Sequence, residues 1–82
     1  MVKIEVLGSG CANCQRLETL AREAVAKLGI EADVEHVTDI KEIMARGVMA
    51  TPGLAIDGKV VLAGRVPSAA EVEGIIAGAV KG

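Results

Sequence analysis

The stretch that decides the fold is Gly8-Ser9-Gly10-Cys11-Ala12-Asn13-Cys14, which holds both cysteines of the chain. A short apolar segment with period-two alternation precedes it, and a long segment with helical periodicity follows it. Two thiols at this spacing on the first turn of a helix can close a local disulfide, and they can also hold a soft metal ion. The choice between these chemistries is the main functional question that the sequence poses.

Hydrophobic periodicity on either side of the cysteines predicts a strand, a helix and a second strand. Residues 2–7 alternate apolar with charged side chains, which is typical of a strand with one clearly apolar face. The helix begins at Cys11 or Ala12 and ends before Gly29, which we expect in the left-handed conformation of a C-terminal cap. Its apolar face comprises Cys14, Leu17, Ala21, Ala24, Val25 and Leu28. Residues 32–37 predict a more polar strand, which we place at an edge of the sheet.

Charged residues on the outer face of this helix are spaced for ion pairs. Two acidic residues each precede a basic residue by four positions, the order that suits the helix dipole. The expected pairs are Glu18–Arg22 and Glu23–Lys27.

A short second helix is expected next. Asp39 followed three residues later by Glu42 is typical of a helix start, because such side chains cap the first backbone N–H groups. Gly47 should end this helix soon after it begins. Met49-Ala50-Thr51-Pro52-Gly53 then forms a break in the pattern.

The last part of the chain predicts a β-hairpin followed by a third helix. Residues 54–56 and 59–63 predict antiparallel strands, because Asp57-Gly58 between them favours a type I′ turn. Ser68 and Glu71 have the spacing of a capping box and predict a helix start. The apolar face of that helix comprises Val72, Ile75, Ile76, Ala79 and Val80.

The predicted element order is β-α-β-α-β-β-α, in a single domain that spans residues 1–82. The first two strands should be parallel, with a right-handed crossover through the first helix, and the hairpin makes the last pair antiparallel. The fold class is therefore α/β, with a four-stranded mixed sheet and helices on both faces. Hydrophobic residues make up 51% of the chain, and none is aromatic, so aliphatic side chains must fill the core.

Composition and charge exclude several functions. The formal net charge is −2, with acids and bases interspersed, and the aromatic residues that stack on bases are missing, so we expect no nucleic-acid partner. No apolar run has membrane-spanning length, and the N-terminus lacks a signal-peptide core, so we expect a cytoplasmic protein. In that reducing compartment, a close cysteine pair is more often catalytic, redox-sensing or metal-binding than structural.

The position of the first cysteine favours a reactive thiolate. Cys11 lies where the helix begins, so unpaired N–H groups and the helix dipole stabilise its charged form. Residues 12–15 are uncharged, and Arg16 adds positive charge nearby. We therefore predict a pKa for Cys11 below the usual value of about 8.5. Cys14 lies one turn further along, on the apolar face of the helix, and should be less exposed than Cys11.

The arrangement of motifs resembles one known family. A Cys-x-x-Cys motif at Cys11 and Cys14 follows the first strand and begins the first helix. Thr51-Pro52 precedes the β-hairpin, and an amphipathic helix ends the chain. Over essentially its whole length, the chain resembles the thioredoxin fold in its minimal, glutaredoxin-sized form. It is most similar to the small redox-active disulfide proteins of that superfamily.

The resemblance implies a thiol–disulfide oxidoreductase. Cys11 would attack a protein disulfide, and Cys14 would resolve the mixed disulfide. Pro52 would be cis and would place Thr51 beside Cys11, where its backbone could bind an extended substrate. The implied partners are protein disulfide substrates and a thioredoxin-reductase-like protein or another dithiol electron donor. No cofactor is implied, because the electrons reside on sulfur, and we expect a monomer.

The chain departs from both well-known branches of the superfamily. Residues 10–14 lack the Trp and the Pro of the usual thioredoxin motif. Residues 63–68 contain one Gly and no Asp, whereas glutaredoxins hold glutathione there with a Gly-Gly and an Asp. We therefore do not predict glutathione as the reductant.

Two other functions remain open for the same thiols. The first is a metal-binding or metal-transfer module, because heavy-metal-associated copper chaperones also place Cys-x-x-Cys after a first strand. Those domains usually carry a Met where this chain has Ser9, and a structural zinc site needs four ligands, whereas this chain adds only His36 to its cysteines. We therefore predict no metal site. The second is a redox-sensing interaction domain, whose disulfide would change partner affinity without turnover.

Other side chains have two interpretations each. Glu5 could assist proton transfer to the second cysteine, as a buried Asp does at a comparable place in thioredoxins. Lys3 on the same face of the strand favours a solvated or paired carboxylate instead. We expect His36 at the surface, and Met44 and Met49 as gap-fillers in the packing.

Overall fold

The order of the secondary-structure elements is the predicted one. The computed structural model describes residues 2–8 and 12–81. Within them the elements are β1 (Val2–Leu7), α1 (Ala12–Leu28), β2 (Ala32–Val37), α2 (Ile40–Ala45), β3 (Gly53–Ile56), β4 (Lys59–Ala63) and α3 (Ala69–Lys81). The α/β fold class, with its β-α-β-α-β-β-α order, is therefore confirmed.

The four strands form one mixed sheet in the order β2-β1-β3-β4. β1 and β2 are parallel, with Val6 opposite His36. β3 is antiparallel to both β1 and β4. β2 is an edge strand, as predicted, and the carboxyl end of central β1 leads directly into the cysteine stretch.

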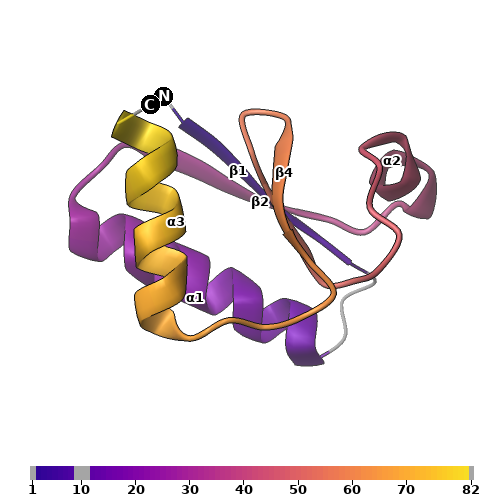
Figure 1. Ribbon diagram of the computed structural model, residues 1–82, viewed down its shortest axis with the longest axis horizontal. Helices are drawn as coiled ribbons and strands as arrows, with labels where there is room; N and C mark the ends of the chain where they lie inside the picture. Colours follow the sequence, from indigo (N-terminus) through magenta and orange to yellow (C-terminus); the bar gives the residue numbers. More distant parts are fainter. Residues whose placement is uncertain (1, 9–11, 82) are drawn as a thin grey trace.

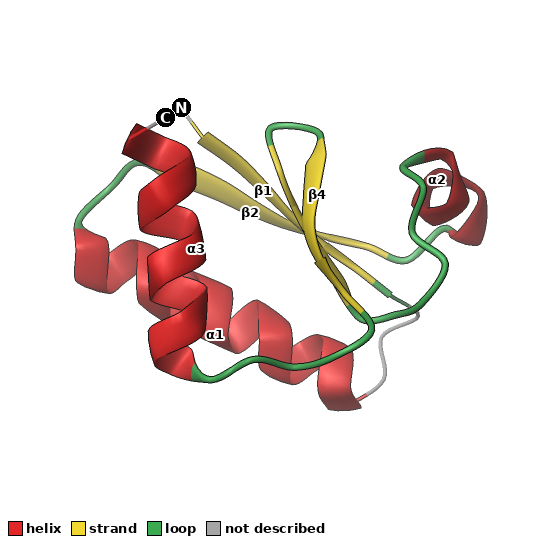
Figure 2. Cartoon of the chain, in the orientation of Figure 1, coloured by secondary structure: helices red, strands yellow, loops and turns green. Residues whose placement is uncertain are grey.

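Helices cover both faces of this sheet. Figure 1 shows α1 and α3 together on one side of the strands and α2 on the other. The same two layers are visible in Figure 2, where the sheet lies between them. On the α1/α3 side the core consists of Ile4, Val6, Leu17, Ala21, Ala24, Leu54, Ile56, Leu62, Val72 and Ile76. On the α2 side it consists of Leu7, Ile43, Val48 and Ala55.

β1 is buried on both faces, which differs from the single apolar face that its sequence predicts. Alternate side chains of a strand point to opposite faces, and here each face carries a helix. Glu5 is consequently only 3% exposed. Both of its carboxylate oxygens accept hydrogen bonds from Arg46, at 3.1 Å to Nε and 2.7 Å to Nη2. The prediction of a solvated or paired carboxylate is therefore confirmed, and it is the paired form that Glu5 adopts.

The predicted turns and caps have the expected backbone. Gly29 has φ +65°, and the N–H of Ile30 donates to the carbonyl of Val25, which completes a cap of the Schellman type. At the hairpin, Asp57 and Gly58 have φ values of +52° and +83°, as a type I′ turn requires.

The last helix is capped in a different way from the expected reciprocal box. The hydroxyl of Ser68 accepts a hydrogen bond from the N–H of Glu71, as predicted. The carboxylate of Glu71 does not return to the helix start but forms an ion pair with Arg65. The hydrogen bond from Arg65 lowers the pKa of Glu71. The loop before α3 is thus tied to the helix by two side chains.

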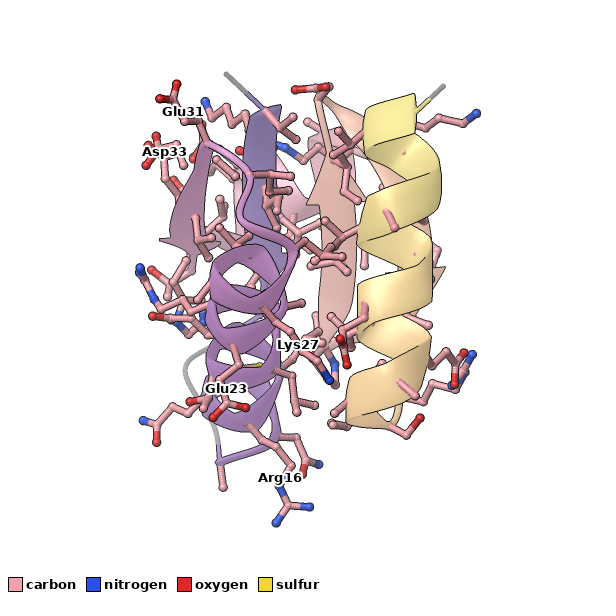
Figure 3. All side chains as sticks on the ribbon, turned by 90° about the vertical axis from the view of Figure 1, so that its left-hand side faces the viewer. Arg16, Glu23, Lys27, Glu31 and Asp33 are labelled. Carbon is pink, nitrogen blue, oxygen red and sulfur yellow. The ribbon has the colours of Figure 1, made fainter. Side chains whose placement is uncertain are left out.

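One of the two predicted ion pairs on α1 is wrong. Arg22 Nε lies 3.0 Å from Glu18 Oε2, as expected. Lys27, however, pairs with Glu73 of α3 at 3.3 Å rather than with Glu23. Figure 3 shows Lys27 between α1 and α3, so the neighbouring helix offers a carboxylate on the packed side.

The apolar faces of α1 and α3 are shorter than predicted. Leu28 is exposed at the end of α1. Ala79 and Val80 are exposed at the end of α3. These residues lie in the last turn of their helices, where they stay partly exposed. Among the described residues, no helix has the length and apolar character that crossing a membrane requires.

The Glu5–Arg46 pair should be important for stability. Replacing Arg46 by Met leaves the buried carboxylate of Glu5 without its partner, which should lower the free energy of unfolding by about 3 kcal/mol. The double variant Glu5→Gln/Arg46→Met should recover part of this loss, because no buried charge remains. Urea denaturation at pH 7 measures both effects.

Arg65→Met is the matched control, because it breaks an ion pair on the surface. Exposed ion pairs contribute little to the free energy of unfolding, so this variant should unfold close to the urea midpoint of the wild type. Equal destabilisation by Arg46→Met and Arg65→Met would contradict a structural role for the buried pair.

Candidate functional site

Cys14 is fully buried in the first turn of α1. It is on the helix face that packs against the sheet, as its periodicity predicts. Cys11, Ser9 and Gly10 lie outside the described residues. The prediction that Cys14 is a poorly exposed thiol is therefore confirmed, and the placement of Cys11 stays a prediction.

The sulfur of Cys14 lies against the backbone of Gly8. A Cβ built on Gly8 would be only 2.1 Å from Sγ of Cys14 and 3.8 Å from Cβ of Thr51. The N–H of Gly8 donates to the carbonyl of Val37 at 3.0 Å, which anchors this part of the chain to the parallel neighbour of β1. The end of β1, the start of α1 and the Thr51 loop therefore meet at one point.

The Thr51–Pro52 segment has the cis peptide bond that the resemblance implies. Thr51 is exposed, whereas the side chain of Pro52 is buried. The carbonyl of Pro52 accepts a hydrogen bond from the N–H of Gly64 at 2.9 Å. This hydrogen bond holds the turn after β4, in which Gly64 has φ +85°, against the loop before β3.

The beginning of α1 carries no negative side chain. The first turn contains no acidic residue, so no carboxylate from that turn occupies its N–H groups. Arg16 points away from the rest of the protein at this end of the helix, as Figure 3 shows. The nearest acid along the helix, Glu18, is already paired with Arg22. A negative charge at this helix end would therefore be stabilised.

His36 is less exposed than predicted. Its Nδ1 lies 3.0 Å from Oε1 of Glu18, and only 20% of its side chain is exposed. Its Nε2 is buried, without a hydrogen-bond partner among the described residues. The prediction of a surface histidine is wrong, because α1 covers the residues of β2 that face it.

Glu5 faces the opposite side of the sheet from α1. Its partner Arg46 caps the carboxyl end of α2, which covers that side. Both carboxylate oxygens are occupied by the guanidinium, so the structure places Glu5 in an ion pair rather than in the cluster of Cys14 and Gly8.

Within the described residues, no group of three or more His, Cys, Asp or Glu side chains is arranged to hold a metal ion.

Comparisons with known proteins agree with this architecture. Residues 2–77 match the thioredoxin domain family. The chain belongs to the thioredoxin family. It is 49% identical over 76 residues to a thioredoxin of Methanothermobacter thermautotrophicus, a match that covers 93% of this chain and 99% of the relative. It is 41% identical over 73 residues to a thioredoxin of Methanocaldococcus jannaschii, a match that covers 89% of this chain and 84% of that relative.

Membership of the thioredoxin family establishes the general activity. The chain is a thiol–disulfide oxidoreductase, as the resemblance implied. The helical pattern predicted the buried position of Cys14, and the resemblance implied the cis bond before Pro52. Gly8 was missed, although a glycine directly after a buried strand and before a cysteine pair is a signal for close backbone packing. Arg46, whose role depends on a residue 41 positions away, was also missed.

Gly8 offers a direct test of this packing. A methyl group at residue 8 would overlap the fully buried sulfur of Cys14, so Gly8→Ala should lower the free energy of unfolding by about 1–3 kcal/mol. It should also slow closure of the intramolecular disulfide. Urea denaturation and the rate of oxidation by a small disulfide measure the two effects.

Gly74→Ala is the matched control, because an added methyl group there meets nothing within 4 Å. Since Gly74 lies inside α3, this variant should be as stable as the wild type or more stable by up to about 1 kcal/mol. A Gly8→Ala protein that behaves like Gly74→Ala would refute the close contact.

Proposed function

We propose that Cys11 and Cys14 are the redox pair that exchanges electrons with protein disulfides. The thiolate of Cys11 attacks one sulfur of a substrate disulfide, forms a mixed disulfide and releases the other sulfur as a thiolate, which takes up a proton. Cys14, after losing its proton, then attacks the sulfur of Cys11. The mixed disulfide breaks, the Cys11–Cys14 bond forms, and the substrate has gained two electrons and two protons.

The burial of Cys14 against Gly8 is the observation that carries this proposal. A fully buried sulfur cannot reach a disulfide in another protein, so the first attack falls to Cys11. Cys14 is protected from outside reagents but is close to the start of α1, where an intermediate on Cys11 would form. The absence of acids from the first turn supports the thiolate that the first step needs.

Thr51 and Pro52 form the substrate-binding part of the proposed site. Thr51 is exposed and is adjacent to the point where Cys14 meets Gly8. An extended segment of the substrate would pair with the backbone of Thr51 in the manner of an added strand. The buried ring of Pro52 and its hydrogen bond to Gly64 hold this backbone in place.

The proposal extends to the cofactor, the electron donor, the location and the oligomeric state. The electrons reside on sulfur, so the pair needs no bound cofactor. A second protein, either a thioredoxin-reductase-like protein or another dithiol donor, regenerates the dithiol. We place this activity in the cytoplasm, in a monomer of one domain.

Single-cysteine variants test the assignment of roles. With dithiothreitol as electron donor, wild-type protein should accelerate the reduction of insulin disulfides, and Cys11→Ser should abolish the acceleration. Cys14→Ser should accumulate a mixed disulfide through Cys11, because the resolving thiol is missing. Mass spectrometry of the trapped product identifies the bonded residue.

The metal-binding and redox-sensing alternatives predict different results. Tight, stoichiometric binding of Zn²⁺ or Cu⁺ without any insulin reduction would support a metal module. Redox-dependent binding of a partner without turnover would support a sensor. A stable mixed disulfide in Cys11→Ser but not in Cys14→Ser would reverse the two roles.

A further inference from the structure

A polar cluster joins the second turn of α1 to the edge strand β2. Glu18 is at its centre, because both of its carboxylate oxygens are used. Oε1 lies 3.0 Å from Nδ1 of His36, and Oε2 accepts a hydrogen bond from Nε of Arg22 at 3.0 Å. Arg22 also donates from Nη2 to the carbonyl of Val34 at 3.1 Å. Glu18, Arg22 and His36, which we call the Glu18 cluster, thus connect the helix to two positions of β2.

The Glu18 cluster contacts the same end of β2 that anchors Gly8. His36 precedes Val37, whose carbonyl accepts the hydrogen bond from the N–H of Gly8. Gly8 in turn lies against the sulfur of Cys14, and Glu18 follows Cys14 by one helical turn. The contacts form a ring that runs from Cys14 to Gly8, on to the end of β2, and back through Glu18 to α1. A shift of the first turns of α1 away from Gly8 therefore strains the bond between Glu18 and His36.

Stability alone does not account for the histidine. Its Nε2 is buried and has no hydrogen-bond partner among the described residues. A buried polar atom without a partner lowers the free energy of unfolding, and an aliphatic side chain at residue 36 would avoid that cost. What His36 provides, and an aliphatic side chain does not, is a directional bond to Glu18.

We infer that the Glu18 cluster holds the sulfur of Cys14 in position against Gly8. Glu18 and His36 are positioning residues for the resolving step, and the inference rests on the proposed function for that step only. In this step the thiolate of Cys14 attacks the Cys11 sulfur of the mixed disulfide, the Cys11–Cys14 bond forms, and the substrate sulfur leaves as a thiolate. An intramolecular attack is fast only while the reacting groups are held near the reacting geometry, so a displaced helix start slows it.

Two substitutions at residue 36 separate positioning from stability. His36→Asn keeps an N–H donor near the place of Nδ1 and removes the buried Nε2. His36→Leu fills the space with an apolar side chain and removes the donor. If His36 only filled space, Leu would be the better replacement. If it positions α1, Asn is the better one.

The rate at which Cys14 is alkylated reports the position of its sulfur. Iodoacetamide reacts with this buried thiol only when a local or global opening exposes it. His36→Leu should raise the rate at least about tenfold, the effect of losing one hydrogen bond to a charged group, without a matching rise in the unfolded fraction. His36→Asn should keep the rate close to that of the wild type. Mass spectrometry gives the rate, and urea denaturation gives the unfolded fraction.

Glu18→Ala and Glu73→Ala form a matched pair. The two carboxylates are similarly exposed, at 25% and 24%, and each forms an ion pair that links α1 to another element. The partner of Glu73 is Lys27, at the opposite end of α1 from the cysteines. Glu18→Ala should raise the alkylation rate of Cys14 as His36→Leu does, whereas Glu73→Ala should leave it unchanged.

The resolving step is measured with the aromatic disulfide dithiobis(nitrobenzoate). The reduced protein forms a mixed disulfide on Cys11 and releases one thionitrobenzoate, and Cys14 then displaces the second. His36→Leu should slow the second release severalfold and leave the first unchanged, because Cys11 attacks before Cys14 takes part. His36→Asn should keep both rates.

Different failures have different meanings. If the alkylation rate of Cys14 rises only in step with the unfolded fraction, or if His36→Asn behaves like His36→Leu, the inference is overturned. Glu18→Ala decides the matter if His36→Leu does not fold. A second release that His36→Leu leaves unchanged would contradict a role in the resolving step. A wild type that forms no mixed disulfide on Cys11 would overturn the proposed function itself, whereas the alkylation of Cys14 does not depend on that function.

Discussion

The sulfur of Cys14 occupies the space that a side chain at residue 8 would need, and this contact fixes the relation between three segments distant in sequence. The end of β1 supplies Gly8, the first turn of α1 supplies the thiol, and the loop before β3 brings Thr51 to the same point. Because protein interiors are closely packed, none of these segments can shift without moving the others. The burial of Cys14, the thiol that we propose as the resolving one, follows from this contact.

The two faces of the sheet carry different structural features. The α1/α3 side contains the larger core and positions Cys14, whereas the α2 side contains the smaller core and the Glu5–Arg46 ion pair. Arg46 caps the short helix α2, and the chain runs from there through Met49 to Thr51. A buried ion pair therefore links the central strand to the end of the helix that precedes the proposed substrate-binding loop.

Local sequence signals predicted most of the fold, because they depend on neighbours in the chain. Period-two and helical patterns, together with Gly29, Asp57-Gly58 and Ser68, gave the element order and the caps. Contacts between segments that are distant in the chain could not be predicted from such local patterns. The partner of Lys27 is on α3 rather than on its own helix, and Glu5 finds Arg46 across 41 positions. The prediction that Met44 and Met49 fill gaps in the packing was also wrong, because both are exposed, and a methionine near a short helix has the same local pattern whether it is covered or not.

The difference in access between the two thiols is the central claim, and alkylation of the reduced wild-type protein tests it most directly. Iodoacetamide is added over a range of pH values, and mass spectrometry reports the modification rate at each cysteine. The account predicts that Cys11 reacts with a midpoint below about 8.5, while Cys14 stays protected until urea unfolds the chain. Modification of Cys14 in the native protein as fast as that of Cys11 would contradict it.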